Sequence, residues 1–212
     1  NKKDDYLLKV TLGIIKLIHK NGISIFKMPI KKPIKQLNSM KTDVLIIGAG
    51  QAGAMTAIAL RQKKYKGSIT IIGEEEHLPY QRPPLSKNFL AGTSDTKNLY
   101  LKSSAYYEQN QINILLNNSV ISINRANKNI ELKDGSKFFY KKLVIAVGSK
   151  LNILDMHCDK ENIYYLKTIK DSIKIRSLLD QQKNIVIIGA GYIGLEIASA
   201  ACKKNHQVTI LE

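Results

Sequence analysis

The sequence has no run of apolar residues long enough to cross a membrane as a helix. Such a helix needs about 20 consecutive apolar residues, whereas the longest apolar runs here, such as Val44–Ile47 and Ile185–Ile188, have the length of β-strands. The hydrophobic fraction of 44% is ordinary for a globular protein. We therefore expect a globular protein that makes no membrane contact.

Cysteine is also scarce, because Cys158 and Cys202 are the only two in 212 residues. They form neither a CxxC pair nor a zinc-binding spacing. His157 and Cys158 are the only adjacent histidine and cysteine, and two neighbouring residues cannot make a metal site alone. The sequence therefore predicts no metal site and two reduced thiols, as is typical of a cytoplasmic protein.

Arginine is rare as well, with only four residues, although the formal net charge is +16. Nine lysines and two aspartates in residues 1–39 account for +7 of that charge. Surfaces that bind nucleic acid usually combine arginine with clustered aromatic residues. The basic charge therefore does not predict a nucleic-acid partner, but it leaves open a weak docking surface for an acidic protein.

Both ends of the sequence look cut. Met40 stands just before the first expected strand, so we expect it to be the natural start and residues 1–41 to be a basic extension that is non-native or disordered. Within that extension, Tyr6–Ile18 has the apolar rhythm of a short helix. A transit peptide is disfavoured, because the segment has no arginine and follows two acids. Glu212 ends a strand, so the sequence begins a second domain without completing it.

Two segments share the order of strand, glycine turn, helix and strand that makes a βαβ unit. In the first, the continuous apolar run Val44–Ile47 predicts a buried parallel strand, and a helix to Lys64 leads to the strand Ile69–Ile72. The second unit runs from Asn184 to Leu211. Because the first glycines of the two turns, Gly48 and Gly189, are 141 residues apart, the two units indicate a duplicated fold rather than a short tandem repeat.

The residues between these units predict a mixture of helices and strands. A proline-rich loop at 77–84 precedes a short helix that starts at Leu85. The remaining expected elements are a helix over Ser103–Gln109, strands over Ile112–Leu116 and Val120–Asn124, a hairpin over Ile130–Tyr140, a buried strand over Leu143–Ala146 and a helix over Asp171–Gln181.

Each glycine turn has the composition of a dinucleotide site. The first glycine permits a tight turn, the second lets the backbone approach a pyrophosphate, and the third lets the helix pack closely on the sheet. The helix N-terminus presents free N–H groups to the phosphates. The two turns are Gly48-Ala49-Gly50-Gln51-Ala52-Gly53 and Gly189-Ala190-Gly191-Tyr192-Ile193-Gly194.

An acidic residue follows each turn at the distance expected for a ribose contact. Glu74 comes 21 residues after Gly53, and Glu212 comes 18 residues after Gly194. A carboxylate at this place accepts hydrogen bonds from ribose hydroxyls and repels a 2′-phosphate, so Glu212 favours NAD over NADP. Two dinucleotide sites in one chain suggest a flavin and a nicotinamide, with FAD at one turn and NADH at the other.

Beyond these motifs, Asp43–Gly92 resembles the FAD-binding start of the ferredoxin/rubredoxin reductase family, and Leu78–Lys87 is its most specific part. The resemblance extends to Glu212 and is strongest to the reductase subunits of bacterial aromatic-ring dioxygenases of the phenylpropionate/cinnamate type. It implies an α/β, Rossmann-like FAD/NAD(P)-binding fold with the two-dinucleotide architecture of glutathione reductase, truncated. Residues 42–150 would form the first part of the FAD domain, 151–183 a connector, and 184–212 the start of the NAD domain.

The resemblance also assigns roles to individual residues. Lys87 would lie near the flavin ring and pair with Glu196, and these two would be the catalytic residues. FAD would be held by Gly48, Gly50, Gln51, Ala52 and Gly53, by Glu74 and Glu75 at the ribose, Arg82 at the phosphates, Val120 at the adenine, and Ala146 and Gly148 beside the flavin. NADH would be held by Gly189, Gly191, Tyr192, Ile193, Gly194 and Glu212.

The sequence departs from the family at two other positions. Val147 stands where the family usually has threonine, which removes a hydroxyl beside the flavin. Lys167 stands where arginine is common, so the charge is kept but the planar fork is lost. The later Gly-Asp motif that completes the FAD site, the rest of the NAD domain and the C-terminal interface domain are absent from the sequence.

The implied activity is hydride transfer from NADH to FAD, followed by electron transfer to a 2Fe–2S ferredoxin that serves a terminal dioxygenase. An NADH oxidase, a flavoprotein like apoptosis-inducing factor, and an incomplete nucleotide-binding fragment without activity remain alternatives. A disulfide reductase needs redox cysteines after the first βαβ unit, and Leu78–Lys87 contains none. The oligomeric state is not predicted.

Overall fold

The computed structural model of the protein describes residues 7–11, 14–19, 22–26, 40–155, 160–181 and 184–212. The chain divides into two compact units, Asn1–Met40 and Lys41–Glu212. No helix in the described ranges is long and apolar enough to span a membrane. The adjacent His157 and Cys158 lie outside the described residues.

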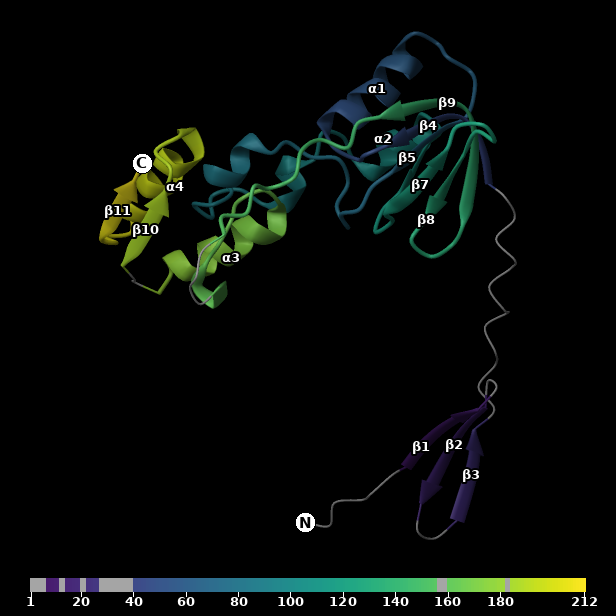
Figure 1. Cartoon of the computed structure of the whole chain (residues 1–212), viewed down its shortest axis with the longest axis horizontal. Coiled ribbons are helices and arrows are strands. Elements are labelled where there is room, and N and C mark those ends of the chain that lie inside the picture. The colour runs from purple at the N-terminus through teal and green to yellow at the C-terminus, as the bar shows by residue number, and fades with distance from the viewer. Residues whose placement is uncertain (1–6, 12–13, 20–21, 27–39, 156–159, 182–183) are drawn as a thin grey trace. The chain divides into compact units, whose positions relative to one another are not determined.

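The smaller unit contains a three-stranded antiparallel sheet in the order β1-β2-β3. The strands are β1 (Leu7–Thr11), β2 (Ile14–His19) and β3 (Gly22–Phe26) (Figure 1). The helix expected over Tyr6–Ile18 is therefore wrong. This segment is rich in β-branched residues, which favour strands, and a dense apolar run does not distinguish a helix from a strand by its period.

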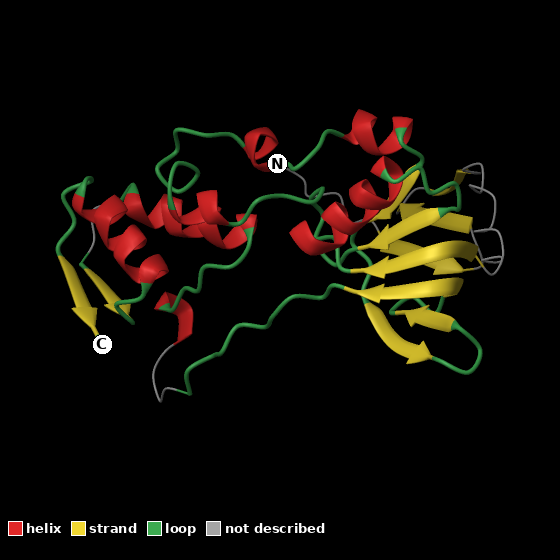
Figure 2. Ribbon diagram, turned by 90° about the horizontal axis from the view of Figure 1, so that it is seen from above, coloured by secondary structure: helices red, strands yellow, loops and turns green. Residues whose placement is uncertain are grey.

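A mixed six-stranded sheet organises the larger unit, in the order β6-β5-β4-β9-β8-β7 (Figures 1 and 2). β4 pairs with β5, and β5 with β6, in parallel, whereas β7, β8 and β9 pair antiparallel. The strands are β4 (Met40–Ile47), β5 (Ile69–Ile72), β6 (Ile112–Leu115), β7 (Val120–Asn124), β8 (Asn129–Leu132) and β9 (Lys137–Ile145).

Helices and a second, two-stranded parallel sheet complete this unit. The α-helices are α1 (Gln51–Gln62), α2 (Ser104–Gln109), α3 (Ile169–Leu179) and α4 (Tyr192–Cys202). The described residues of this unit also form the short 3₁₀ turns η1 (Pro83–Ser86), η2 (Thr96–Leu99) and η3 (Lys160–Asn162). β10 (Ile185–Ile188) and β11 (Val208–Leu211) form the second sheet, with α4 between them in the chain.

The apolar run in β4 is buried on both faces of the six-stranded sheet, as the sequence predicts. Val44 and Ile46 pack in one cluster with Ala57 of α1, while Leu45 and Ile47 pack in another with residues of β8 and β9. Alternate residues of a strand point to opposite faces, so a strand that is covered on both sides must be apolar throughout. This burial fixes the end of β4, where the first glycine turn begins.

Two expectations in the middle of the chain need correction. Residues 143–145 are a strand as expected, but they end the longer strand β9 rather than forming a separate buried strand, and Ile145 is 61% exposed. The helix expected from Leu85 is instead the turn η1, which begins two residues earlier at Pro83. Proline is favoured in the first positions of a helical turn, because its missing N–H would have no partner there.

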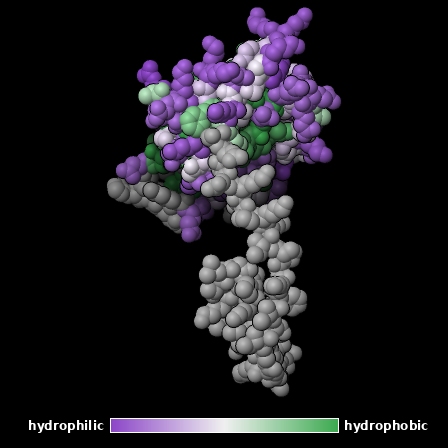
Figure 3. Space-filling model, turned by 90° about the vertical axis from the view of Figure 1, so that its right-hand side faces the viewer, coloured by the Kyte–Doolittle hydropathy of each residue, from purple (hydrophilic) through white to green (hydrophobic). Residues whose placement is uncertain are grey.

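Hydrophilic side chains dominate the face of the larger unit that Figure 3 shows, around a smaller hydrophobic area. Several apolar side chains of the two-stranded sheet are exposed, among them Val186 at 61% and Ile188 at 55%. The apolar run of β10 therefore has the length of a buried strand but is only partly covered by the described residues.

Candidate functional site

The first glycine turn leaves β4 with a backbone that only glycine accommodates. Gly48 has φ +110, and a Cβ there would lie 2.2 Å from the carbonyl oxygen of Ala146 on the neighbouring strand segment. A Cβ on Gly53 would lie 2.0 Å from the carbonyl oxygen of Gly48. These two glycines let the turn close and let α1 approach the sheet, as the sequence predicts.

The middle glycine of this turn, unlike the other two, has open space beside its Cα. Gly50 is the N-cap of α1, and a Cβ there would meet nothing within 4 Å. No side chain caps the helix, and its first turn has no acidic residue. The N–H groups that open a helix lack partners within it, and Gln51 and Ala52 are exposed. The residues present thus fit a pyrophosphate at this helix N-terminus.

The second turn repeats this geometry. Gly189 has φ +100, and a Cβ on Gly194 would lie 2.1 Å from its carbonyl oxygen. Gly191 is the uncapped N-cap of α4, and a Cβ there would meet nothing within 4 Å. Tyr192 is 89% exposed and Ile193 is 52% exposed. The turn differs from the first in that Glu212 Oε2 accepts a hydrogen bond from the Ala190 N–H.

The acidic residues after β5 separate into two roles. Glu74 is exposed, and its Oε1 accepts a hydrogen bond of 3.1 Å from Ser119 Oγ. Both oxygens of Glu75 have partners within the loop, because Oε2 accepts from the Tyr80 hydroxyl at 2.6 Å and Oε1 lies 2.7 Å from Arg82 Nη2. Of the two glutamates, Glu74 therefore has the carboxylate better placed to accept a ribose hydroxyl.

Arg82 holds the proline-rich loop against the segment before α3. Its Nη1 donates to the Lys167 carbonyl oxygen, and its guanidinium lies 5.3 Å from the centroid of the Tyr80 ring. Burial, and then the hydrogen bond to Glu75, raise the pKa of Tyr80 above its ordinary value. Lys167 Nζ in turn donates to the Ser149 carbonyl oxygen. Arg82 thus organises the loop, and it is part of the candidate phosphate site only by the resemblance.

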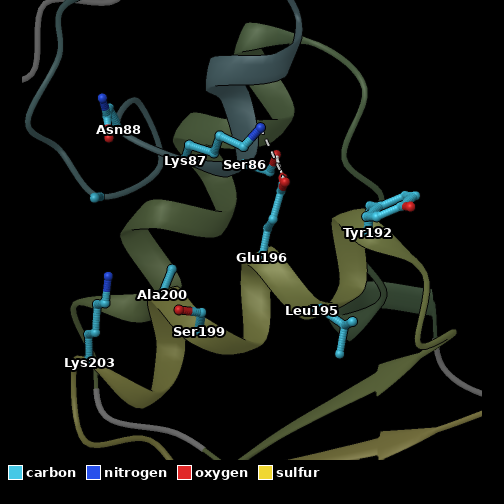
Figure 4. A pocket seen from close by; sticks show the side chains of 10 residues that line it. Ser86, Lys87, Asn88, Tyr192, Leu195, Glu196, Ser199, Ala200 and Lys203 are labelled. Atoms are coloured by element: carbon cyan, nitrogen blue, oxygen red, sulfur yellow. Dashed lines mark hydrogen bonds and ion pairs between the residues drawn. The ribbon is translucent and has the colours of Figure 1, made fainter.

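The structure brings together the pair Lys87 and Glu196, which are far apart in the sequence. Lys87 follows η1 and Glu196 lies on α4, and Lys87 Nζ is 3.2 Å from Glu196 Oε1. The two side chains point toward one another beside a pocket of about 360 Å³ (Figure 4). A hydrogen bond from Ser86, and then the neighbouring Lys87, hold the pKa of Glu196 below its usual value.

The remaining predicted residues lie on β7 and at the end of β9. Val120 begins β7 and packs on the cluster around Leu45 and Ile47. The Ala146 N–H donates to the Ile47 carbonyl oxygen at 2.8 Å, which places it beside the first turn. Gly148 has φ +68, a left-handed conformation that favours glycine. Val147, between them, is 64% exposed.

Ser86 is the residue that sequence reasoning missed. It lies in the segment Leu85-Ser86-Lys87, where Lys87 is a predicted site residue, but its partner Glu196 is 110 residues away. No local pattern could have revealed this contact. The described residues contain no group of three potential metal ligands, and the described cysteine, Cys202, is exposed at the end of α4.

The strands β4 and β10 each pair in parallel with the next strand of their own sheet, and each leads through a glycine turn into an uncapped helix. This arrangement defines an α/β protein with a Rossmann-like dinucleotide-binding fold. The chain belongs to the pyridine nucleotide-disulphide oxidoreductase family, whose model matches residues 42–212. Members of this family use FAD and NAD(H).

Similar proteins include two curated reductases. The chain is 38% identical over 170 residues to a rubredoxin-NAD(+) reductase from Pseudomonas putida, covering 80% of this chain and 44% of the relative. It is 39% identical over 171 residues to the ferredoxin–NAD(+) reductase component of a 3-phenylpropionate/cinnamic acid dioxygenase from Photorhabdus laumondii, covering 79% of this chain and 43% of the relative. The chain thus spans less than half the length of these relatives.

Among solved structures, the chain is similar to the reductase in a covalent complex of putidaredoxin reductase with putidaredoxin. The TM-score is 0.77 and the identity 36%, over 82% of this chain and 43% of the other. The predicted fold and the predicted resemblance are therefore confirmed for residues 42–212.

Proposed function

We propose that the protein is an NADH-dependent, FAD-containing reductase whose electron acceptor is a 2Fe–2S ferredoxin that serves an oxygenase. The observation that carries the proposal is the ion pair of Lys87 and Glu196. It joins the loop after the first βαβ unit to α4, the helix that follows the second glycine turn. Similarity to reductases of rubredoxin and of dioxygenase ferredoxins supports the choice of acceptor.

In this proposal the first turn and Glu74 hold FAD, and the second turn and Glu212 hold NADH. Bound FAD would supply the chemistry, because it accepts a hydride and releases electrons singly. The open space at Gly50 and at Gly191 lets the backbone approach the two pyrophosphates. Glu212 lies at the second turn through its bond to Ala190, where a carboxylate disfavours the 2′-phosphate of NADPH.

Lys87 would provide a positive charge close to the reacting ring. Its side chain is 53% exposed, and the Glu196 carboxylate 3.2 Å away limits where the ammonium lies. A cation held in this position lowers the energy of negative charge that arrives on a bound group. Glu196 therefore acts on the chemistry through Lys87.

The domain boundaries follow from this division of roles. Residues 42–150 would contribute to FAD binding, 151–183 would connect, and 184–212 would begin the part that binds NADH, while 1–41 would be an extension. A cytoplasmic location is also a proposal, and the scarcity of cysteine supports it.

The test is to purify the full-length gene product and record its absorption spectrum and its oxidation of NADH. We expect a flavin spectrum and NADH oxidation that accelerates strongly with an added 2Fe–2S ferredoxin, with NADPH a poorer donor. Dioxygen and a small disulfide serve as comparison acceptors for the oxidase and disulfide-reductase alternatives. Turnover of the disulfide alone, equal rates with dioxygen and ferredoxin, or a protein without flavin would each contradict the proposal.

A further inference from the structure

Ser86 is a buried serine that lies next to Lys87 and has no part in the function proposed so far. It is 6% exposed and ends the turn η1, which is stiffened by Pro83 and Pro84. Proline fixes one backbone torsion, and the neighbouring Leu85 is 2% exposed. The hydroxyl of Ser86 is therefore attached to a part of the backbone that has little freedom.

The two oxygens of the Glu196 carboxylate are divided between these neighbouring residues. Ser86 Oγ donates to Oε2, and Lys87 Nζ lies 3.2 Å from Oε1 (Figure 4). A hydroxyl has one proton to donate. The other acceptor within reach of Ser86 Oγ, the Pro83 carbonyl oxygen, is 3.4 Å away, so the proton goes to the carboxylate.

The two contacts of Glu196 differ in how firmly they can hold it. Lys87 has a long side chain that is 53% exposed, so by itself it has the freedom to move and fixes the Glu196 carboxylate only weakly. The bond from Ser86 comes from a short, buried side chain to a charged acceptor, which makes a stronger hydrogen bond. Ser86 therefore positions Glu196, and Glu196 in turn positions Lys87.

We propose that Ser86 is a positioning residue, which holds the Glu196 carboxylate in the orientation that places the ammonium of Lys87. This inference rests on the proposed function for its catalytic consequence, but the contact itself does not depend on any bound group. Because Ser86 stabilises the ionised carboxylate, its loss raises the pKa of Glu196. Glu196 must be ionised to attract Lys87. Without Ser86, the fall in activity on the acid side of the pH profile should therefore begin at a higher pH.

The test uses the full-length flavoprotein, four single variants and the double variant that combines Ser86→Ala with Glu196→Gln. Ser86→Ala removes the hydroxyl, Ser86→Thr keeps it, and Glu196→Gln removes the charge that Ser86 acts on. Ser172→Ala is the matched control, because Ser172 is a fully buried serine beside η1 that donates at 2.7 Å to the Leu85 carbonyl oxygen rather than to Glu196. The readouts are the pH profile of flavin reduction by NADH in a single turnover, the midpoint potential of the flavin, and the urea midpoint of unfolding.

We expect Ser86→Ala to shift the acid limb of the pH profile upward by about one unit, as the loss of one charge-assisted hydrogen bond implies. The midpoint potential of the flavin should shift as well. Ser86→Thr, which keeps the hydroxyl, and Ser172→Ala should leave the acid limb and the midpoint potential as in the unchanged protein. Adding Ser86→Ala to Glu196→Gln should give no further shift of either quantity. A shift that persists in the Glu196→Gln background, or one that Ser172→Ala reproduces, overturns the inference.

The urea midpoints separate this inference from the proposed function. The effects of Ser86→Ala and Glu196→Gln on the midpoint are expected to be non-additive at pH 7, because the two residues share one bond. That coupling needs no NADH. Coupling without any flavin reduction would refute the proposed function and leave the contact standing, whereas additive effects would refute the role of Ser86.

Discussion

At the scale of single residues, Asp43 shows how one carboxylate secures the start of the larger unit. Its Oδ2 accepts hydrogen bonds from the Ser68 N–H at 2.7 Å and from Ser68 Oγ at 2.9 Å, and its Oδ1 lies 2.6 Å from Lys141 Nζ. The hydrogen bond with Lys141, and then those with Ser68, lower the pKa of Asp43 from 3.8 to about 2.

The shift predicts a particular pH dependence of stability. A carboxylate whose folded pKa is depressed stabilises the fold above its unfolded pKa, and that stabilisation is lost as the pH falls through the folded value. The window here lies between 3.8 and about 2. We therefore expect Asp43→Asn to lower the urea midpoint equally at pH 7 and pH 5, and by less at pH 3, as measured by circular dichroism.

Asp155→Asn is the matched control for this prediction, because Asp155 is exposed and makes no hydrogen bond or ion pair with the described residues. It should change the midpoint little at any of these pH values. An effect of Asp43→Asn that grows toward pH 3 would contradict the assignment, because it would place the stabilising form below the unfolded pKa.

At the scale of elements, each of the two glycine turns combines a closely packed glycine with an open one, where we propose that a cofactor binds. A Cβ on Gly53 or on Gly194 meets backbone oxygen at 2.0 or 2.1 Å, whereas a Cβ on Gly50 or on Gly191 meets nothing within 4 Å. The same motif thus contains a packing glycine and an open one. Only the open one lies where a pyrophosphate would approach.

Alanine substitutions should separate these two roles. We expect Gly50→Ala to cost less than about 1 kcal/mol of stability, as for a change at an N-cap, and to abolish flavin retention. Gly191→Ala should keep the flavin and raise the KM for NADH at least tenfold. Gly53→Ala and Gly194→Ala should lower the unfolding midpoint strongly. Flavin content by absorbance, steady-state kinetics and urea unfolding check these outcomes.

The assignment of FAD to the first turn depends on the contrast between the open positions. If Gly191→Ala lost the flavin while Gly50→Ala kept it, the two sites would have to be exchanged. Folded protein from Gly53→Ala with an unchanged midpoint would contradict the close packing of α1 on the sheet.

At the scale of the whole chain, the net charge bears on the encounter with an electron acceptor: of the +16 in total, +7 lies in residues 1–39, and 16 − 7 = +9 remains in residues 40–212. An excess of one charge attracts partners of the other sign and accelerates association, and added salt screens that attraction. We expect the second-order rate constant for reduction of an acidic ferredoxin to fall at least several-fold between about 0.05 M and about 0.5 M salt. Stopped-flow measurements over a salt series give this constant.

Dioxygen is the matched comparison for the salt series, because a neutral acceptor is not attracted by the charge. Its reduction should be nearly independent of salt. A ferredoxin rate constant that stays constant over the series would show that the basic charge has no part in partner association.

Much of the fold was predictable because its signals are local. The buried run of β4, the glycine turn and the helix α1 follow one another within the chain, so period and turn chemistry identify them. The failures lie where local signals are ambiguous. The dense apolar run in Tyr6–Ile18 does not distinguish a helix from a strand by its period, and Ile145 is exposed although its run reads as buried.

The candidate site divides in the same way. The turn residues and the position of Glu74 could be found by spacing, and the resemblance paired Lys87 with Glu196 before the structure placed them 3.2 Å apart. The sequence did not separate Glu74 from Glu75, because the bonds from Tyr80 and Arg82 that occupy Glu75 depend on how the loop folds.

By itself, the sequence determined the position of the two glycine turns and the family of the chain, because each turn is a contiguous motif that can be recognised from its own residues. Only the tertiary structure decided which glycines pack and which are open, which glutamate is engaged in the loop, and that Ser86 reaches Glu196. The physical reason is that these properties belong to contacts between segments distant in the chain, and such contacts exist only once the sheet and helices have packed.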